Sequence, residues 1–399
     1  MTTERRPSRP ARAILGAFAA LGLLTAASGL VAALAGADDG SPVRRETLGH
    51  IPGPLVGAFY AVVTVALVAA GILFARRSAR WQRGRPEARP TTRANAGRRL
   101  RRLRRGLYMQ TLLRDPAAGL MHCALYFGFV VLFGVTVVLE IDHQLPRGAK
   151  FLHGDVYRAY SLVADLAGVV FLVGVGWAAG RRYLRRHRRL RLDTRPQDAW
   201  VLGILATIGV SGFVAEGLRI ALDGRPRFER WAVVGWPLSG GFAGEAGLAG
   251  WYRATWVVHV VAFVAFVVMV PLTKLRHALT SPLNMYLSDR DRPKGAMRAM
   301  PDLLTVEVDR LGASTVDDLS WKQLLDTDAC TLCGRCTDAC PAQATGKVLD
   351  PRTIVLKVGA ALASDEGALL PPVTPEEVWA CTTCRACDEA CPVDIEILD

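Results

Sequence analysis

Cysteine is scarce over most of this sequence of 399 residues. Eight of the nine cysteines lie between Cys330 and Cys391, and Cys123 stands alone in an apolar stretch. A disulfide-stabilised secreted domain spreads its cysteines through a small, loop-rich fold. The distribution excludes that class and points to a metal site within residues 330–391.

Charge is missing from several long stretches. Hydrophobic residues make up 51% of the chain, mean hydropathy is +0.23, and the charged residues (21%) gather in blocks. An apolar run of about 20 residues crosses a hydrocarbon layer of roughly 30 Å as a helix. Six spans are predicted, at 13–35, 54–75, 117–139, 159–180, 200–222 and 254–273. They exclude a purely soluble enzyme and make the lipid bilayer the first partner.

Lysine and arginine are distributed unevenly over the connections between spans. Residues 1–12, 76–116 and 181–199 hold 4, 14 and 8 of them, against 2, 3 and 4 in 36–53, 140–158 and 223–253. Because basic connections stay on the cytoplasmic side, both termini are predicted to be cytoplasmic. The protein is therefore expected in the cell membrane, as a multi-pass protein whose C-terminal domain faces the cytoplasm.

The net charge of +13 raises the question of a nucleic-acid partner. The basic runs adjoin apolar spans, and the sequence contains no recognisable nucleic-acid-binding motif. Anionic lipid headgroups explain these runs, so no nucleic-acid partner is expected.

The first span has two interpretations. Four arginines precede it and small residues follow near Ala35, as in a secretory signal peptide. The apolar run is longer than a usual signal-peptide core, which favours a retained helix. A cleaved first span would leave five spans and the same cytoplasmic C-terminal domain.

Two cysteine runs share one spacing. Residues 330–341 read CTLCGRCTDACP and residues 381–392 read CTTCRACDEACP, both C-x2-C-x2-C-x3-C-P, with first cysteines 51 residues apart. Structural zinc is bound by two C-x2-C pairs. The third cysteine that each run carries at the same interval would not be needed as a zinc ligand. Disulfides do not suit a reducing cytoplasm. The runs therefore predict two [4Fe–4S] clusters.

This spacing resembles that of two-cluster ferredoxins, in which the fourth cysteine of each run ligates the other cluster. The resemblance implies two ligand sets, namely Cys330, Cys333, Cys336 and Cys391 for cluster one and Cys340, Cys381, Cys384 and Cys387 for cluster two. Between the runs, residues 353–363 are helix-compatible, and Thr374 with Pro375 forms a helix start signal. A helical cluster domain is expected rather than a β-rich one.

Histidines near the span ends are candidate haem ligands. His259 and His277 are 18 residues apart, or five turns, so a continuous helix would carry both on one face, about 27 Å apart. Pro271 between them is a possible kink. His122 opens the third span on the cytoplasmic side, level with His277. Imidazoles from facing helices can clamp one b-type haem iron, so His122 and His277 are the predicted inner pair.

The outer partner of His259 is either His143 or His153. His143 lies 21 residues past His122, on the same helix if that helix continues to Gln144. His153 follows Pro146 at the start of the fourth span. The alternative for His143 and for His153 is an ordinary loop histidine without a ligand role. We therefore expect one haem or two, depending on whether His259 has an outer partner.

Three charged residues lie inside apolar spans, namely Asp165, Glu216 and Arg219. Charges are costly in lipid and mark functional sites there. We predict that these residues serve a proton path or a quinone pocket. Glu216 and Arg219 are three apart on a helix, so mutual neutralisation is the alternative.

Together these residues resemble a known family. Spans three to six, with His122 in GLMHCALYFGF and with His259 and His277 in VVHVVAF and KLRHALTSPLN, resemble the haem b membrane subunit of respiratory nitrate reductase. The tail resembles the helical ferredoxin module of heterodisulfide reductase-related proteins. The combination is similar to membrane-bound iron–sulfur oxidoreductases of the electron-transfer-flavoprotein dehydrogenase type.

The resemblance implies an all-α fold, a polytopic bundle of six transmembrane helices followed by a cytoplasmic α-helical ferredoxin-like domain. The expected parts are a first helix with an outer loop (1–53), a second helix with an arginine-rich linker (54–116), a haem b four-helix domain (117–280) and the ferredoxin domain (281–399).

The implied function is electron transfer from a soluble flavoprotein, through two [4Fe–4S] clusters and haem b, to a membrane quinone. One departure is that such proteins continue into domains with a Cys-Cys-Gly pair, so either this chain is truncated or those domains form a separate subunit. Two alternatives remain. One is the membrane subunit of a quinol-dependent heterodisulfide reductase-like complex, and the other is a non-enzymatic redox-sensing membrane protein.

Overall fold

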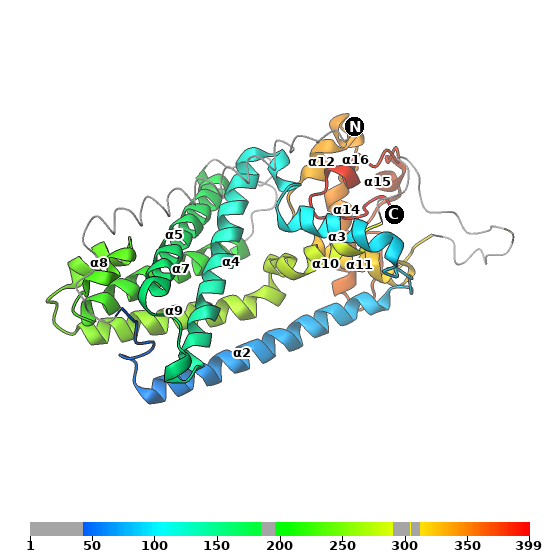
Figure 1. The fold of residues 1–399 in the computed structure, drawn as a ribbon. Helices are drawn as coiled ribbons and strands as arrows, with labels where there is room; N and C mark the ends of the chain where they lie inside the picture. The colour runs from blue at the N-terminus through cyan, green and yellow to red at the C-terminus, as the bar shows by residue number, and fades with distance from the viewer. Residues whose placement is uncertain (1–42, 185–195, 290–303, 305–311) are drawn as a thin grey trace, which may run out of the picture. The chain divides into compact units, whose positions relative to one another are not determined.

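The computed structural model describes residues 43–184, 196–289, 304 and 312–399, which form two compact units (Figure 1). The first unit contains residues 43–67, 113–184 and 196–268. The second contains residues 68–112, 269–289, 304 and 312–399. The predicted span at 13–35 lies outside the described residues.

Five long helices carry the apolar runs. They are α2 (Gly53–Ala79), α4 (Pro116–Gln144), α5 (Gly154–Ala179), α7 (Pro196–Leu222) and α9 (Leu248–Leu272). Even the shortest has 25 residues, which rise about 37 Å and exceed the hydrocarbon thickness of a membrane. All five are apolar enough to cross it. The five predicted spans between residues 54 and 273 are thus confirmed as helices of membrane-spanning length.

Helix α4 has a complete start signal. Asp115 precedes it in an extended conformation, and its carboxylate accepts a hydrogen bond from the N–H of Ala118 at 3.3 Å. Pro116 occupies the first position, where a missing N–H leaves no hydrogen bond unmade. The helix continues to Gln144, as the assignment of His143 to this helix required.

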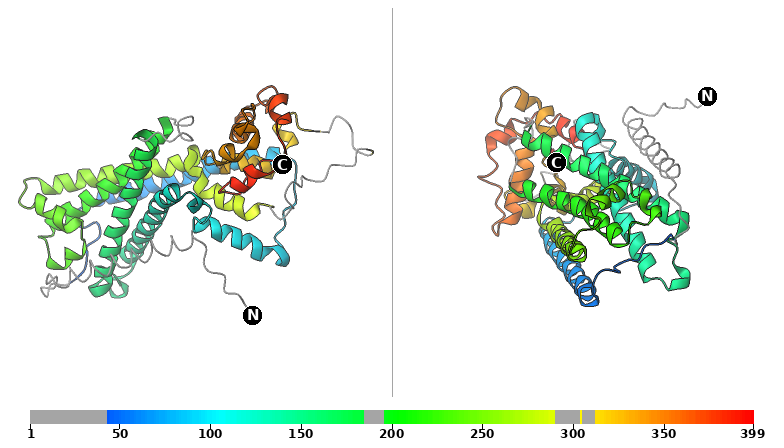
Figure 2. Two further views of the ribbon diagram at one scale, coloured as in Figure 1. Left: turned by 90° about the horizontal axis from the view of Figure 1, so that it is seen from above. Right: turned by 90° about the vertical axis from the view of Figure 1, so that its left-hand side faces the viewer.

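Two glycines let the backbones of α4 and α5 approach each other. The helices lie side by side (Figure 2). A Cβ on Gly128 would lie 2.8 Å from the backbone nitrogen of Phe171, and one on Gly174 would lie 2.6 Å from that of Leu125. Membrane helices associate through such small residues because close packing replaces the hydrophobic force that lipid removes.

Short helices complete the first unit. They are η3 (Arg147–Ala149), the π-turn η4 (Gly180–Leu184), η5 (Arg227–Trp231) and α8 (Gly235–Phe242). Helix α8 packs on α7. A turn, η2 (Leu112–Arg114), leads into α4.

The second unit consists of short helices around the end of α2. In chain order they are η1 (Arg80–Arg83), α3 (Arg93–Leu107), η6 (Lys274–Arg276), α10 (His277–Leu287), η8 (Val316–Asp318), α11 (Trp321–Ala329), α12 (Arg335–Ala339), α13 (Pro341–Ala344), α14 (Pro351–Ala363), α15 (Pro375–Trp379) and α16 (Ala386–Ala390). Val316, Leu324 and Leu325 are fully buried in its core, with Trp81 packed against them. Burying each of the aliphatic side chains contributes about 1.5–3 kcal/mol.

The cluster domain is helical, as predicted. The described residues contain isolated β-bridges but no strand. Helix α14 covers the predicted segment 353–363. Thr374 caps α15, because its Oγ1 accepts the N–H of Glu377 at 3.3 Å while the Glu377 carboxylate accepts the N–H of Thr374 at 2.9 Å. The predicted start signal is therefore confirmed.

Part of the arginine-rich connection is folded as α3, which packs on α10. Gly106 lies at the crossing, where a Cβ would collide with the side chain of Met285. The guanidinium of Arg102 donates a hydrogen bond to the carbonyl of Ser288 at 2.6 Å. Lipid headgroups are the partners expected from the sequence for these arginines, but some of them bind protein atoms.

The prediction of one continuous helix through His259 and His277 is wrong. Helix α9 ends at Leu272, Thr273 is extended, and α10 begins at His277 after the turn η6. Thr273 accounts for the break, because its backbone is extended and its Oγ1 accepts the N–H of Leu275 at 3.2 Å, which starts the next turn. Pro271 lies inside α9 and weakens the turn before it, since proline lacks the N–H of a helix hydrogen bond. The two imidazoles do not share one helix face, and the estimated spacing along a common axis does not apply.

Candidate metal centres

The two cysteine runs repeat in the backbone as well as in the sequence. Equivalent positions are left-handed, namely Leu332 with Thr383 and Gly334 with Arg385, with φ between 55° and 71°. A five-residue helix then follows in each run, α12 in the first and α16 in the second. Left-handed residues turn the chain sharply, so that cysteines at intervals of three can approach one another.

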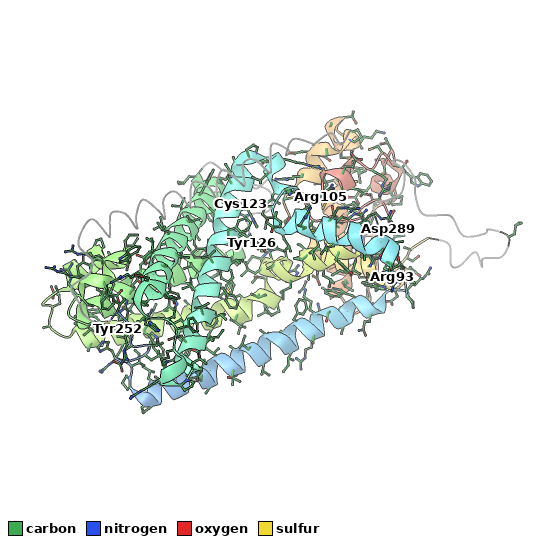
Figure 3. All side chains as sticks on the ribbon, in the orientation of Figure 1. Arg93, Arg105, Cys123, Tyr126, Tyr252 and Asp289 are labelled. Carbon is green, nitrogen blue, oxygen red and sulfur yellow. The ribbon has the colours of Figure 1, made fainter. Side chains whose placement is uncertain are left out.

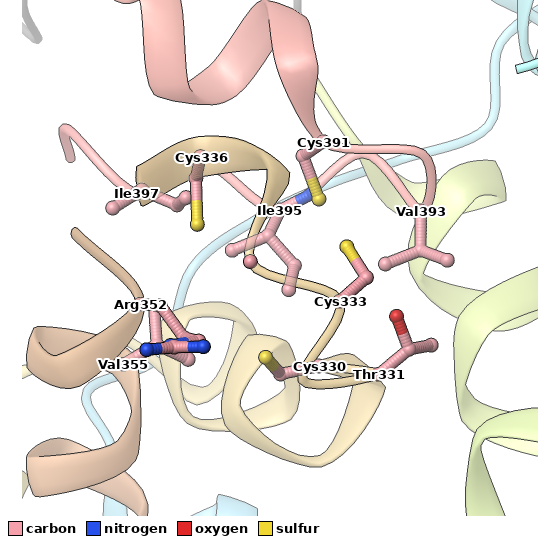
Figure 4. Close-up of a pocket in the computed structure, with 11 residues that line it drawn as sticks. Cys330, Thr331, Cys333, Cys336, Arg352, Val355, Cys391, Val393, Ile395 and Ile397 are labelled. Carbon is pink, nitrogen blue, oxygen red and sulfur yellow. The ribbon is translucent and has the colours of Figure 1, made fainter. Parts of the chain in front are cut away.

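Four thiols line one cavity of about 330 Å³, its open mouth included (Figure 4). Three belong to the first run and one to the second, in the order Cys330, Cys333, Cys336 and Cys391. Their sulfur atoms point into the cavity. Helix α12 packs against α16, which brings Cys391 to the first run. The Cys391 sulfur also accepts a hydrogen bond from the N–H of Ile395 at 3.4 Å.

Besides Thr331 and Gly334 of the first run, four apolar side chains and one arginine line the cavity. The apolar ones are Val355, Val393, Ile395 and Ile397, and the arginine is Arg352. The segment after Pro392 is fixed by Asp388, whose carboxylate accepts the N–H of Ile397 at 2.8 Å. Solvent exclusion and nearby charge tune the potential of an iron–sulfur centre.

The chemistry of these thiols suits a cluster. No three His, Cys, Asp or Glu side chains of the described residues converge closely enough for one metal ion, and a single zinc would hold its sulfurs about 3.8 Å apart. Burial raises the pKa of Cys330 to about 11 and that of Cys336 to about 12. A bound metal centre would stabilise the thiolates here, and the four sulfurs around one cavity fit the ligand number of a [4Fe–4S] cluster.

The other four cysteines of the runs are Cys340, Cys381, Cys384 and Cys387. Cys340 is buried in a small apolar cluster with Ala342 and Leu349. Ala380, which directly precedes Cys381, packs against this cluster. The Cys381 sulfur accepts a hydrogen bond from the N–H of Thr383 at 3.4 Å. Burial raises the pKa of Cys387, and the charges of neighbouring residues, Cys381 among them, act in the same direction. Since Cys381 and Cys384 are exposed, this set lies nearer to solvent than the first.

His277 is half-buried at the start of α10. Its Nδ1 lies 2.6 Å from the carbonyl oxygen of Lys274, which can only accept, so Nδ1 is the donor. A neutral imidazole that donates from Nδ1 presents its lone pair at Nε2, the atom that a haem iron takes. Burial lowers the pKa of His277 and so favours this neutral form.

His259 on α9 has the same arrangement against α7. Its Nδ1 lies 3.0 Å from Oγ of Ser211, which itself donates to the carbonyl of Thr207 at 2.5 Å. The hydroxyl therefore accepts from the imidazole. Gly212 lies next to the ring, and a Cβ there would make an ordinary contact of 3.5 Å with the His259 Cε1.

The remaining predicted haem ligands lie in the first unit. His122 is half-buried in the second turn of α4, beside the buried Cys123 (Figure 3). His143 is half-buried in the last turn of α4, and its carbonyl accepts a hydrogen bond from Lys150. His153 is exposed and precedes α5. His277 belongs to the second unit, so its pairing with His122 stays a prediction. The pairing of His259 with His143 or His153 also stays a prediction.

The predicted intramembrane charges belong to a larger cluster. Arg219 is 2% exposed and pairs with Glu229 at 2.7 Å. Tyr157 donates a hydrogen bond to the same Glu229 oxygen at 2.8 Å. Glu229 and Tyr157 are not predicted from the sequence, because the first lies outside the spans and the second is only weakly polar. Arg219 also pairs with Asp223 at 3.1 Å, and its charge acts on Glu216 as well. The alternative that Arg219 and Glu216 neutralise each other therefore stays a prediction.

The two predicted carboxyl groups meet at the start of α8. Asp165 accepts hydrogen bonds from the N–H groups of Val234 at 2.6 Å and Gly235 at 3.2 Å. Asp165 and Glu216 are also hydrogen-bonded to each other. A hydrogen bond between two carboxyl groups requires one proton, so the pair can hold a proton.

Comparison with known proteins identifies two domains. The nitrate reductase gamma subunit family matches residues 110–292, and the 4Fe-4S dicluster domain family matches residues 329–395. No solved structure matches the chain.

Among curated relatives, EtfAB:quinone oxidoreductase of Syntrophomonas wolfei is 32% identical over an alignment of 328 positions, and the match covers 71% of this chain and 45% of the relative. The probable iron-sulfur-binding oxidoreductase FadF of Bacillus subtilis is 28% identical over 72% of this chain and 46% of the relative. A shorter match, 34% over 20% of the chain and 37% of the relative, is to an iron-sulfur subunit of the CoB–CoM heterodisulfide reductase of Methanopyrus kandleri. The chain thus spans less than half the length of these relatives.

Proposed function

We propose a membrane electron-transfer function for this chain, which belongs to the iron–sulfur oxidoreductases that combine a nitrate reductase gamma domain with a 4Fe-4S dicluster domain. Electrons pass from a cytoplasmic donor through two [4Fe–4S] clusters and haem b to a membrane quinone. The observation that carries the proposal is the cavity lined by three thiols of the first cysteine run and one of the second.

The proposed cluster ligands are the two sets of four cysteines given above. When bound, the clusters supply one-electron transfer, and the chain fixes their positions and potentials. Cys391 ties the two runs together, because it lies in the cavity of the first run while following α16 of the second. Arg352 in the cavity wall offsets the negative charge that four thiolates bring.

The proposed haem ligands are His122 with His277, and His259 with either His143 or His153. The match to the nitrate reductase gamma subunit family supports haem in this region. His259 and His277 both donate from Nδ1 to an oxygen. Ligating histidines are usually oriented in this way, with Nε2 aimed at the metal.

The proposed quinone and proton residues are Asp165, Glu216 and Arg219. Reduction of a quinone consumes protons as well as electrons, and the Asp165–Glu216 pair can hold one. Arg219, fixed by Glu229, contributes a positive charge close by.

The proposed donor and acceptor rest on relatives. One relative is named for EtfAB and quinone, and we extend both to this chain as a flavoprotein donor and a quinone acceptor. Matches to iron-sulfur subunits of heterodisulfide reductases favour a second candidate, a component of a reductase complex that takes electrons from quinol. The two differ in whether reduced flavoprotein or quinol reduces the centres.

Spectroscopy of the purified full chain tests the proposal. We expect two [4Fe–4S] EPR signals and a haem b absorption band, reduced by flavoprotein and reoxidised by a menaquinone analogue. Cys391→Ser should remove one cluster signal, while Cys123→Ser, at the lone buried cysteine of α4, should retain both. His277→Ala should reduce the haem band. Two intact cluster signals in Cys391→Ser, or zinc in place of iron, would contradict the proposal.

A further inference from the structure

The carboxylate of Asp328 joins three segments of the second unit. Asp328 lies at the end of α11, two residues before Cys330, and is 3% exposed. Its Oδ1 accepts hydrogen bonds from Arg77 at the end of α2, at 2.6 and 2.9 Å, and from Arg276 at 2.9 Å. Its Oδ2 accepts a hydrogen bond from the indole of Trp81 at 2.9 Å.

The same site fixes α11 to α10 through the backbone. The hydroxyl of Thr280 donates to the carbonyl of Asp328 at 2.9 Å, and that of Ser281 donates to the carbonyl of Ala329 at 3.2 Å. Helix α10 begins at His277, and Cys330 directly follows Ala329. The hydrogen bonds therefore hold the segment with a proposed cluster ligand against the helix with a proposed haem ligand.

Two positive charges face one negative charge at this site. Two guanidinium groups, on Arg77 and Arg276, share one carboxylate oxygen. The charge of Arg276 acts on the thiol of Cys330. In a buried setting such charges interact strongly, so removing the carboxylate would leave the positive charge of Arg276 uncompensated near Cys330.

We propose that Asp328 is a positioning residue for electron transfer between cluster one and the haem at His277, and that its charge sets the potential of cluster one. The inference rests on the proposed function. The step it concerns moves one electron from the reduced cluster to iron(III) of the haem, which becomes iron(II), and no covalent bond forms or breaks. Asp328 takes no part in the chemistry and acts through Arg276, Thr280 and the backbone before Cys330.

Potentiometry followed by EPR on the full chain tests the charge effect. In Asp328→Asn we expect the midpoint potential of cluster one to rise by about 59 mV, which is a tenfold change in the one-electron equilibrium constant. The midpoint potential of cluster two should stay unchanged. Arg276→Gln should shift it in the opposite direction, and the double variant should return close to the wild type. Asp317→Asn removes a carboxylate from an exposed ion pair with Arg83 in the same unit and should shift neither cluster.

The positioning effect is measured as the single-turnover rate of haem reduction by cluster one. It should fall at least tenfold in Asp328→Ala, which removes the hydrogen bonds as well as the charge. The inference would be overturned if Asp328→Asn and Arg276→Gln shifted the potential of cluster one in the same direction, or if both clusters shifted equally. An unchanged rate of haem reduction in Asp328→Ala would also overturn it. If the wild type lacked the cluster or haem signals, the proposed function would fail instead, so the two failures are distinguishable.

Discussion

Ser211 accepts a hydrogen bond from the imidazole of His259 while donating its own proton to the carbonyl of Thr207. A hydroxyl has a single proton to donate, so this chain of contacts fixes which nitrogen of His259 carries hydrogen. The tautomer that a haem ligand requires is thus set by a residue on the adjacent helix α7, 48 positions earlier in the chain.

Ser211→Ala should therefore weaken a haem held by His259. Loss of such an outer hydrogen bond reduces metal affinity about 10- to 100-fold. Haem content and the midpoint potential of the purified variant measure the effect. Thr207→Ala is the matched control on the same helix, because it keeps the carbonyl that Ser211 uses and removes only a hydroxyl bonded to Gly203. Equal haem content in both variants would argue against His259 as a ligand.

Gly174→Ala should destabilise the first unit. The new Cβ would lie 2.6 Å from the backbone nitrogen of Leu125, which cannot move independently of α4. Overpacking of this kind costs about 1–3 kcal/mol. Gly176→Ala on the same helix is the control, since a Cβ there meets no atom within 4 Å. Thermal unfolding in detergent compares the two, and equal midpoints would mean that α4 and α5 pack differently.

The ion pair between Arg89 and Glu396 should make the stability of the second unit depend on pH. The guanidinium donates two hydrogen bonds to the carboxylate, at 2.9 and 2.7 Å. Burial by itself acts to raise the pKa of Glu396, but the hydrogen bonds and charges of Arg89 and Lys322 lower it from 4.5 to about 2. A carboxyl with a lowered folded-state pKa stabilises the fold above its unfolded pKa and loses this contribution as the pH falls.

We expect about 3 kcal/mol of stability to disappear as the pH falls from about 4.5 to about 2. Glu396→Gln should be less stable at neutral pH and should lack this dependence. Guanidinium unfolding at a series of pH values measures both. Asp326, whose pKa burial raises to about 6, has the opposite dependence over a higher range. Because the charge of Glu396 contributes to this shift, Glu396→Gln should also move the pKa of Asp326 down. Parallel pH profiles for variant and wild type would contradict the assignment.

Thr383→Gly should stabilise the second cysteine run. Thr383 has φ 55°, a left-handed conformation that a β-branched residue adopts at a cost of about 1–2 kcal/mol. Glycine relieves this cost, less its own loss of backbone entropy. Thr382→Gly, at the preceding residue, has no left-handed strain to relieve and should destabilise. The free energies of unfolding decide, and a loss of stability in Thr383→Gly would show that the threonine side chain matters more than its backbone.

The features that could be predicted from the sequence are those with local causes. The five described apolar helices follow from unbroken runs without charge, and the start of α15 follows from Thr374, Pro375 and Glu377, which are close neighbours. The cysteine spacing predicted the [4Fe–4S] domain that comparison then identified.

The errors and omissions arise from long-range contacts. Pro271 indicates a possible kink, but the break after Leu272 depends on Thr273 becoming extended and its hydroxyl capping the next turn at Leu275. Asp328 reads as an ordinary acidic residue, and its partner Arg77 is 251 positions away. No spacing rule connects such residues, because only the folded second unit brings them together.

The cavity at Cys330 also has a consequence for how the protein is made. Its fourth thiol, on Cys391, comes from the second run, which the ribosome adds only after the whole of α14 and α15. A nascent chain that has emerged as far as the first run offers only three of the four sulfurs. Assembly of the cluster proposed for this cavity would therefore be completed only after synthesis of the second run.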